Sequence, residues 1–175
     1  SSYGPSLAVK SLSDEKEKEY RKKLSNFSFL SCREQDGAQL LSRITQKEVK
    51  CVLDPTLLLS AKEWGKYCEF EIPKEPYILV YFLGEKSEHR RAVEKIQKLT
   101  NWKIISLPAA YLEMENNDYK KVWGGPKEFL SLIRGAALIC TDSFHGTMFS
   151  INFQRNFFSF CKSSDSEESS ENSRL

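Results

Sequence analysis

An α/β fold, built on a parallel sheet with helices on both faces, is predicted by three features of the sequence. Short apolar runs alternate with amphipathic segments along the 175 residues, as expected when helices connect the strands of a parallel sheet. The run Tyr-Ile-Leu-Val-Tyr-Phe-Leu at 77–83 is apolar throughout, which is typical of a strand buried on both faces. Hydrophobic residues make up 40% of the chain, enough for a packed core. Together these features predict a Rossmann-like sheet.

The first part of the chain begins with a predicted helix for which Ser13 is a suitable N-cap, because acidic residues follow it. Asp54-Pro55 is expected to end a strand, and Ser60 and Glu63 have the spacing of a capping box. The predicted elements are, in order, a helix (13–24), a strand (27–32), a helix (36–44), a strand (49–53) and a short helix (60–67).

A linker is predicted at 70–76, where Pro73 and Pro76 flank two charged residues. Pro126 suits the first position of a helix, because its missing N–H would have no partner there. The tail from 162 is rich in Ser and Glu and is expected to be a mobile loop or a segment ordered only by a ligand. The elements predicted after the linker are a strand (77–83), a helix (87–99), a strand (103–107), a polar loop through 116–118, a helix (126–134), a strand (137–140), a helix (145–153) and a strand (157–160).

Composition argues against several classes of protein. The net charge is only +2, with Lys and Glu interspersed, so a nucleic-acid partner is not expected. The five cysteines form no Cys-x-x-Cys pair, which argues against a zinc site and a disulfide framework. The sequence contains no apolar run of roughly 20 residues and no visible signal peptide. We therefore expect a cytoplasmic protein without a bound metal.

The turn Thr-Asp-Ser-Phe-His-Gly-Thr at 141–147 is the main candidate site. It follows an apolar strand and opens an apolar helix, and ligands of open parallel sheets bind at this end of the strands. Backbone N–H groups at such a helix start attract anions. Ser143, Gly146 and Thr147 would contact the ligand, and His145 would donate or accept a proton. The alternative is that Ser143 or Asp142 only caps the helix and that His145 is a half-buried structural residue.

Other turns offer weaker candidates. Arg33 follows a strand and suits the capture of a carboxylate or phosphate, although an ion pair with Glu34 or Asp36 would also explain it. Gly84 and Glu85, in the turn before the helix at 87–99, could meet an anionic or sugar ligand. Glu128 could reach a ligand from the first turn of its helix, although the helix dipole alone explains an acidic residue there. His89 lies among charged residues of a helix and is assigned no role.

These motifs, in this order and spacing, resemble those of the polysaccharide pyruvyl transferase family over nearly the whole chain. The resemblance implies two Rossmann-like domains arranged as in GT-B glycosyltransferases, with the active site in the cleft between them. Residues 1–72 would end an incomplete amino-terminal domain, 73–161 would form the carboxyl-terminal domain, and 162–175 would be a flexible segment. The motifs are Ser31-Cys-Arg-Glu34 with Gly37, Cys51 to Leu59 with Glu63-Trp64, Gly125 to Ile133, Cys140 to Thr147 and Phe157 to Phe160.

The family resemblance implies transfer of a pyruvyl group from phosphoenolpyruvate, as co-substrate, to sugar hydroxyls, forming a ketal on a cell-surface polysaccharide or its lipid-linked precursor. No cofactor is implied, and the glycan acceptor would bring the protein to the inner face of the membrane. Arg33 would be the cationic ligand, and His145 the acid and base or a phosphate ligand. Better-known members resemble Arg-Leu-His where this chain has Ser143-Phe144-His145, which leaves open how the donor is bound and whether it is another compound. A glycosyltransferase that uses a nucleotide sugar and a non-catalytic Rossmann-like binding module remain alternatives.

Overall fold

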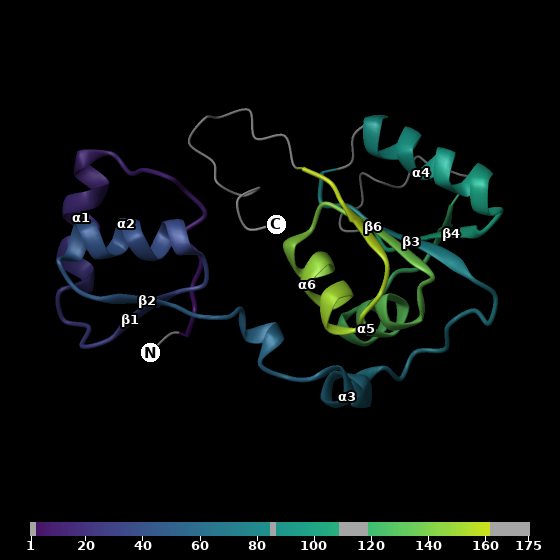
Figure 1. Cartoon of the computed structure of the whole chain (residues 1–175), viewed down its shortest axis with the longest axis horizontal. Coiled ribbons are helices and arrows are strands. Elements are labelled where there is room, and N and C mark those ends of the chain that lie inside the picture. The colour runs from purple at the N-terminus through teal and green to yellow at the C-terminus, as the bar shows by residue number, and fades with distance from the viewer. Residues whose placement is uncertain (1–2, 85–86, 109–118, 162–175) are drawn as a thin grey trace. The chain divides into compact units, whose positions relative to one another are not determined.

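The computed structural model describes residues 3–84, 87–108 and 119–161 (Figure 1). The chain forms two compact units, which divide between Leu58 and Leu59. Glu85, most of the expected polar loop and the Ser- and Glu-rich tail lie outside the described residues. The two units are described separately below.

The first unit contains a β–α–β arrangement. Strand β1 (Leu30–Cys32) pairs in parallel with β2 (Val49–Cys51), and α2 (Gln35–Thr45) connects them. Helix α1 (Asp14–Leu24) precedes β1, and the Ser13 side chain accepts a hydrogen bond from the Lys16 backbone as the predicted N-cap. The strands are shorter than predicted, but every element expected in this unit is present.

Gly37 allows α2 to approach β1 closely. A Cβ atom at this position would lie 2.7 Å from Sγ of Cys32, which is fully buried. No side chain therefore fits at Gly37 without moving the helix away from the strand. This gives a physical reason for the glycine in the motif Ser31-Cys-Arg-Glu34 with Gly37.

The second unit is built on a five-stranded parallel sheet in the order β5-β4-β3-β6-β7. Its strands are β3 (Tyr77–Tyr81), β4 (Lys103–Ser106), β5 (Lys120–Lys121), β6 (Leu138–Thr141) and β7 (Phe157–Ser159). The helices that connect them are α4 (Ser87–Thr100), α5 (Pro126–Gly135) and α6 (Phe144–Asn152). All paired strands run parallel, with Ile78 opposite both Ile104 and Leu138. The sheet confirms the predicted fold class, although the two-residue strand β5 was not predicted from its charged sequence.

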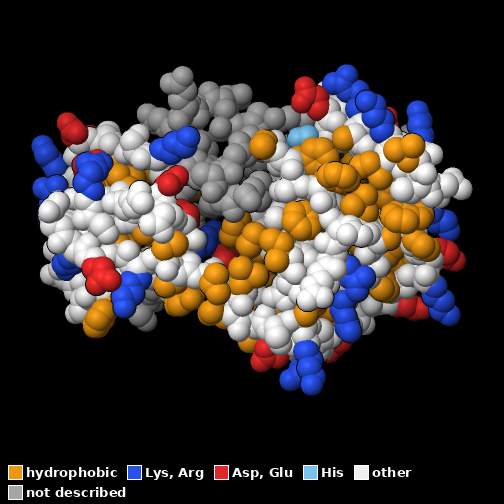
Figure 2. All heavy atoms as spheres, in the orientation of Figure 1, with side chains coloured by type: hydrophobic (Ala, Val, Ile, Leu, Met, Phe, Trp, Pro, Cys, Tyr) orange, Lys and Arg blue, Asp and Glu red, His pale blue; other side chains and the backbone are white. Residues whose placement is uncertain are grey.

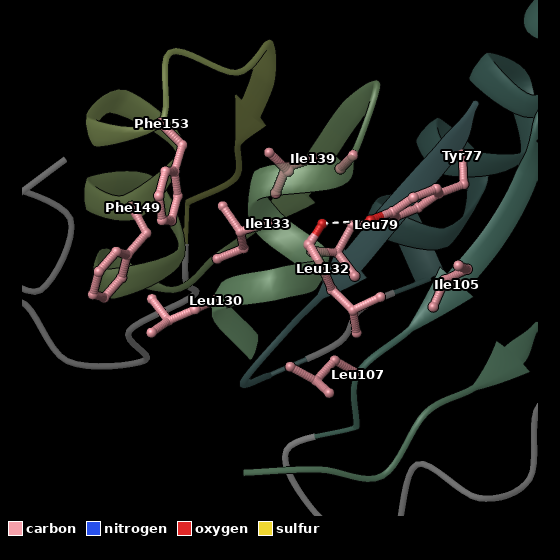
Figure 3. Close-up of a cluster of buried hydrophobic side chains, with 11 residues drawn as sticks. Tyr77, Leu79, Ile105, Leu107, Leu130, Leu132, Ile133, Ile139, Phe149 and Phe153 are labelled. Carbon is pink, nitrogen blue, oxygen red and sulfur yellow. Dashed lines mark hydrogen bonds between the residues drawn. The ribbon is translucent and has the colours of Figure 1, made fainter. Parts of the chain in front are cut away.

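Helices cover both faces of this sheet (Figure 1). Tyr77 and Leu79 of β3 belong to a buried cluster with residues of α5 and α6 (Figure 3), whereas Ile78 and Val80 pack with Val93 of α4. Because successive side chains of a strand point to opposite faces, a strand covered on both sides needs an unbroken apolar run. This explains the sequence at 77–83.

The segment before β3 packs within the second unit. Helix α3 (Ala61–Trp64) has the predicted capping box between Ser60 and Glu63, and the 3-10 helix η2 (Gly65–Tyr67) follows it, whereas the 3-10 helix η1 (Pro55–Leu57) precedes it in sequence and belongs to the first unit. The ring of Trp64 lies 5.1 Å from that of Phe149 in α6. Residues 59–72 are thus grouped with the second unit by their contacts, whereas the sequence predicts a domain boundary after residue 72. The assignment of two evolutionary domains stays a prediction.

His89 requires a correction. It was placed among charged residues of a helix surface, but its side chain is only 4% exposed and lies between the rings of Phe82 and Phe160, at centroid distances of 4.9 and 5.0 Å. His89 precedes the buried Val93 by four residues, so both lie on the apolar face of α4. Because two arginines directly follow His89 in the sequence, its place on the apolar face of the helix was not predicted.

The surface shows no large region of a single charge in the view of Figure 2, where basic and acidic side chains are intermixed on both units. None of the helices in the described ranges has the length and apolar character needed to cross a bilayer.

Candidate functional site

The site lies where the strand order of the second sheet reverses. From β3 the chain adds β4 and β5 on one side, and it then adds β6 and β7 on the other. The turns after β3 and β6 therefore lead to helices on opposite faces of the sheet, and open parallel sheets bind ligands in the crevice between such turns. The predicted site turn, 141–147, is one of these two turns, and Gly84 lies in the other.

His145 is the exposed residue of the turn at 141–147, which otherwise consists of buried or half-buried residues. It is in the first turn of α6, and its ring lies 5.3 Å from that of Phe144 in an edge-on arrangement. The imidazole is thus accessible to a ligand at the carboxyl end of the strands. This position is consistent with the proton-transfer role predicted for it and excludes a sealed structural histidine.

Ser143 and Thr147 shape the start of α6. The Ser143 side chain accepts a hydrogen bond from Gly146 N at 3.3 Å as the N-cap, and its carbonyl accepts one from Thr147 Oγ1 at 3.2 Å. Thr147 Oγ1 also shares a hydrogen bond with Ser159 at 3.0 Å. Both side chains are only 3% exposed. Their hydroxyls are occupied within the fold, so the direct substrate contacts expected from them stay predictions.

Gly146 permits a close contact between α6 and β6. A Cβ atom there would lie 2.5 Å from Thr141 Oγ1. The hydroxyl of Thr141 donates to the Tyr81 carbonyl at 2.6 Å and accepts from Ser143 N at 3.0 Å, so it is held in place. Gly146 therefore fixes the position of the first turn of α6, from which His145 projects.

Asp142 joins the two turns of the switch point. Its Oδ1 accepts a hydrogen bond from Leu83 N at 2.6 Å, and its Oδ2 accepts one from Gly84 N at 2.9 Å. From the sequence alone Asp142 is a candidate only for capping the helix, a role that Ser143 takes instead. An acidic residue directly after a buried strand was the available signal, but only the tertiary fold shows which backbone groups it binds.

Gly84 is exposed and has space around it. The nearest atom to a Cβ added there would be Asp142 Oδ2, at an ordinary contact distance of 3.7 Å. Packing against the described residues therefore does not require glycine at this position. Close approach of a ligand to the backbone is a further reason for a glycine in such a turn. Glu85, which was predicted to act beside it, lies outside the described residues.

Glu128 lies away from the switch point. It is in the first turn of α5, which follows β5, and β5 is separated from β6 by β4 and β3. Three strand spacings of about 4.8 Å put the ends of β5 and β6 roughly 14 Å apart. The Glu128 carboxylate accepts a hydrogen bond from Gly125 N at 2.7 Å, so it stabilises the start of its own helix. A role in ligand binding stays a prediction.

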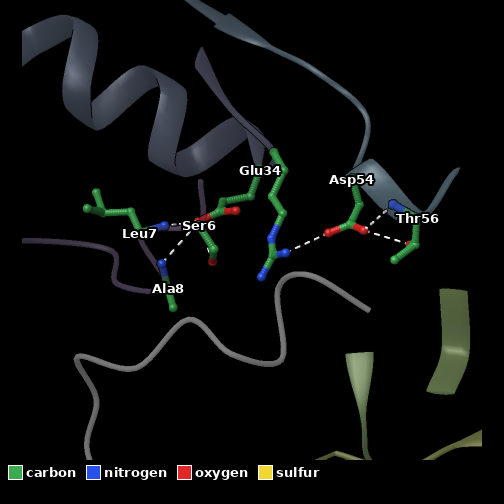
Figure 4. Close-up of polar contacts among 7 residues, drawn as sticks. Ser6, Leu7, Ala8, Glu34, Asp54 and Thr56 are labelled. Carbon is green, nitrogen blue, oxygen red and sulfur yellow. Dashed lines mark hydrogen bonds and ion pairs between the residues drawn. The ribbon is translucent and has the colours of Figure 1, made fainter. Parts of the chain in front are cut away.

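Arg33 belongs to the first unit, where it forms an ion pair with Asp54 at 2.6 Å rather than with Glu34 or Asp36. Asp54 also accepts hydrogen bonds from Thr56 N and Oγ1, at 2.9 and 2.6 Å (Figure 4), as expected of a residue that ends a strand in a turn. The Arg33 guanidinium is therefore held beside a buried carboxylate at the end of β1. Its capture of a substrate anion stays a prediction.

Glu34 is a buried carboxylate whose role was not predicted. Its Oε1 accepts hydrogen bonds from Ser6 Oγ and from the backbone of Leu7 and Ala8 (Figure 4). Ala8 has a φ of 56°, and a left-handed residue in such a segment helps to turn successive N–H groups toward one anion. Glu34 thus fixes the segment before α1 against the carboxyl end of β1.

A cavity of about 700 Å³ lies at the opposite edge of the second sheet. It is lined by the first residues of three strands, Tyr77, Lys103 and Lys120, and by the segment that precedes β3. Ligands of open parallel sheets bind at the other edge, and the cavity is not lined by a histidine. We therefore place the candidate site at the switch point. Among the described residues, no group of three His, Cys, Asp or Glu side chains could hold a metal.

Comparison with known proteins identifies the family. A model of the polysaccharide pyruvyl transferase family matches residues 2–160. The chain belongs to this family. A comparison with curated proteins gave no match. The family match includes both motifs singled out above, the strand end with Arg33 and the turn with His145, and it bears out the resemblance seen in the sequence.

A solved structure with a similar fold is that of UDP-GlcNAc 2-epimerase from Methanocaldococcus jannaschii, with a TM-score of 0.51 and 14% identity. The match covers 79% of this chain and 47% of the epimerase, so this pyruvyl transferase family member spans about half the length of that protein. At this identity the likeness concerns the fold alone. It supports the GT-B-like, Rossmann-like fold class predicted from the sequence.

Proposed function

We propose that the protein transfers a pyruvyl group from phosphoenolpyruvate to the hydroxyls of a sugar in cell-surface polysaccharide biosynthesis. Membership of the family supports the transfer reaction. The observation that carries the assignment to the switch point is the exposed imidazole of His145 at the start of α6. The buried contacts of Thr141, Asp142 and Ser143 hold this turn, and a group held in place before the reaction is effective in proton transfer.

The reaction needs one acid and one base. In the first step an acid protonates the methylene carbon of phosphoenolpyruvate, and a sugar hydroxyl then adds to the neighbouring carbon and loses its proton to the conjugate base of that acid. In the second step phosphate leaves with the C–O bonding electrons, and a second hydroxyl adds and gives its proton to the departing phosphate, which completes the ketal. We assign the proton transfers of the first step to His145, because imidazole exchanges protons near neutral pH. The products are the ketal and inorganic phosphate, so no external oxidant or cofactor is needed.

The donor carries a carboxylate and a phosphate, which need positive partners. At the switch point the start of α6 supplies a partial positive charge, and the backbone at Gly84 is accessible. Ser143 caps α6 here, at the position where better-known members resemble Arg, so this chain would bind the donor without that cation. Arg33 of the first unit is the further cationic group that we propose for donor binding. A lipid-linked sugar acceptor would bring the protein to the inner face of the membrane.

The decisive assay supplies the full-length protein with phosphoenolpyruvate and, separately, with nucleotide sugars, each with a panel of sugar acceptors. We expect release of inorganic phosphate with phosphoenolpyruvate, and a new ketal methyl signal in the proton NMR spectrum of the acceptor. Release of nucleotide without release of phosphate would instead support a glycosyltransferase. If neither donor is consumed but one binds, a non-catalytic module is the better description.

His145→Ala tests the catalytic role. We expect a loss of kcat of at least about 100-fold, the range for removal of a general acid or base. Because the side chain is exposed, free imidazole in the buffer should enter the vacated position and restore part of the activity. An activity within about threefold of the wild type would remove His145 from the mechanism.

Arg33→Ala has a matched control in Arg43→Ala. Both arginines lie in the first unit and form ion pairs, but Arg43 pairs with Glu17 on α1 and lies in the last turn of α2, away from the carboxyl ends of the strands. We expect Arg33→Ala to raise the KM for phosphoenolpyruvate and Arg43→Ala to leave it unchanged. Since Arg33→Ala also leaves the buried Asp54 without its ion pair, Arg33→Ala/Asp54→Ala separates a loss of stability from a loss of binding. If both single variants kept the wild-type KM for phosphoenolpyruvate, Arg33 would be excluded as a donor ligand.

A further inference from the structure

Asp142 forms a connection between two parts of the chain that are nearly 60 residues apart in sequence. Both of its carboxylate oxygens accept backbone hydrogen bonds from the turn after β3, one from Leu83 and one from Gly84. The side chain is only 1% exposed. Hydrogen bonds to a charged acceptor are shorter and stronger than neutral ones, so this contact restrains the turn.

The restrained turn would otherwise be weakly held. Leu83 is 45% exposed, Gly84 is exposed, and among the described residues a Cβ added at Gly84 would meet only Asp142. Phe82, immediately before them, is buried and anchored in the core under α4. Within the described part of the chain, Phe82 is the last buried residue before this turn, and the Asp142 carboxylate accepts the backbone hydrogen bonds of the next two residues.

The other side of the connection is rigid. Asp142 lies between Thr141, whose hydroxyl binds both Tyr81 and Ser143, and Ser143, which caps α6. His145 lies directly after Phe144 in the first turn of the same helix. The carboxylate therefore fixes the backbone of the β3 turn relative to the start of α6, which carries the imidazole.

A buried carboxylate is an expensive way to make this link. Among the described residues its hydrogen-bond partners are backbone N–H groups rather than a lysine or arginine, so these N–H groups and the positive end of α6 must offset the burial of its charge. If this contact only stabilised the fold, apolar packing between the two turns could do the same. The Asp142 carboxylate also orients the two N–H groups that donate to it. This indicates that the backbone of the turn after β3 needs a defined geometry.

We propose that Asp142 is a positioning residue of the switch-point site. It holds the Leu83–Gly84 backbone at the place where a bound donor contacts it, while His145 acts from the opposite side. This inference rests on the proposed function only in taking the switch point as the ligand site. It assigns to Asp142 an effect on donor binding, not on the proton transfer itself.

The restraint is measured by amide hydrogen exchange of Leu83 and Gly84 in the full-length protein, which requires no substrate. We compare the wild type with Asp142→Ala and with Tyr77→Phe as the matched control. Tyr77 is also 1% exposed and makes a buried hydrogen bond, to the Leu132 carbonyl at 2.7 Å, but it lies at the opposite end of β3. We expect Asp142→Ala to accelerate exchange at these two amides at least tenfold, and Tyr77→Phe to leave it unchanged.

The positioning role is measured by the kinetic constants of the same variants. We expect Asp142→Ala to raise the KM for phosphoenolpyruvate at least tenfold with kcat within about threefold of the wild type. Asp142→Asn, which keeps one carbonyl acceptor, should restore part of the affinity. Tyr77→Phe should keep the wild-type KM, and urea unfolding of all three variants gives the stability against which each KM is compared. A purely structural role would instead make the KM follow the loss of stability in all three variants.

Two results would overturn the proposal: unchanged exchange at Leu83 and Gly84 in Asp142→Ala, or faster exchange with an unchanged KM. Failure of the proposed function is recognised separately. If the wild-type protein consumes a nucleotide sugar and not phosphoenolpyruvate, pyruvyl transfer is excluded, and the same KM comparison with the nucleotide sugar decides the role of Asp142. If a donor binds without turnover, its dissociation constant replaces the KM.

Discussion

Gly146→Ala is the substitution whose effect follows most directly from the geometry of the site. The added Cβ would lie 2.5 Å from Oγ1 and 3.1 Å from Cγ2 of Thr141, whereas real Cβ atoms almost never approach other heavy atoms within 3.0 Å. Thr141 cannot move aside freely, because its hydroxyl binds Tyr81 and Ser143 and its side chain is fully buried. Either α6 shifts away from β6 or the Thr141 hydrogen bonds break.

The expected cost is the balance of three effects. Insertion of a methyl group into a packed interior costs about 1–3 kcal/mol, and loss of one Thr141 hydrogen bond adds about 1 kcal/mol. The higher helix propensity of alanine returns about 1 kcal/mol. We therefore expect Gly146→Ala to lower the free energy of unfolding of the second unit by about 1–3 kcal/mol.

The assay is urea unfolding followed by tryptophan fluorescence, since all three tryptophans of the chain lie in the second unit at positions 64, 102 and 123. Gly84→Ala is the control, because its Cβ meets one atom at 3.7 Å, and we expect a change within about 0.5 kcal/mol. In a double-mutant cycle, Thr141→Ala removes the atoms that collide with the new methyl group, so the cost of Gly146→Ala should fall by more than about 1 kcal/mol in that background.

Two outcomes would refute this reasoning. Stabilisation by Gly146→Ala would mean that helix propensity outweighs the contact with Thr141. Additive effects of Gly146→Ala and Thr141→Ala would mean that the two residues do not interact as the distances indicate. In either case contact with Thr141 would not make Gly146 a determinant of the position of His145.

Three further predictions concern buried polar groups. Tyr77→Phe should lower the free energy of unfolding by about 1 kcal/mol, because the Leu132 carbonyl loses its donor. Burial raises the pKa of Tyr77, so the folded state keeps a proton that the unfolded chain loses near pH 10. Wild-type stability should therefore decline above about pH 10, and less steeply in Tyr77→Phe, as titration of the urea midpoint with pH will show. His89→Phe should leave the free energy of unfolding unchanged or raise it by up to about 1 kcal/mol in the same assay. The reason is that Nδ1 of His89 is buried without a hydrogen-bond partner in the described part of the chain. A decrease of more than about 1 kcal/mol would show that Nδ1 does form a hydrogen bond. Iodoacetamide should label the exposed Cys51 in the native protein but Cys140 only after unfolding. Cys140 is buried, and burial raises the pKa of its thiol to about 12. Peptide mass spectrometry that found Cys140 labelled in the native protein would contradict its burial in the core.

Local sequence signals predicted most of the fold. The capping residues Ser13 and Ser60 marked two helix starts correctly, and Pro126 marked a third. The apolar run at 77–83 identified the central strand, because a strand covered on both faces has no polar side to interrupt it. The strand β5 was missed since it consists of two lysines, whose position beside β4 is decided by backbone pairing rather than by side-chain character.

The candidate site was predicted in part. His145 could be singled out because an ionisable residue in a strand-to-helix turn is exposed to the crevice of an open sheet. The roles of the other candidate residues could not be predicted in the same way. Ser143 and Thr147 have the composition of ligand contacts, yet their hydroxyls stabilise α6, and Glu128 stabilises the start of α5.

The sequence by itself determined the alternation of strands and helices, the motifs of the family and the turn that carries the imidazole, because each depends on residues close together along the chain. Only the tertiary structure decided that Asp142 binds Leu83 and Gly84, that His89 is enclosed between Phe82 and Phe160, and that Gly146 rests on Thr141. These contacts join segments that are distant in sequence or depend on the angle between a helix and a strand. Hydrophobic periodicity specifies which side of an element is buried, but not which polar group of another element it meets.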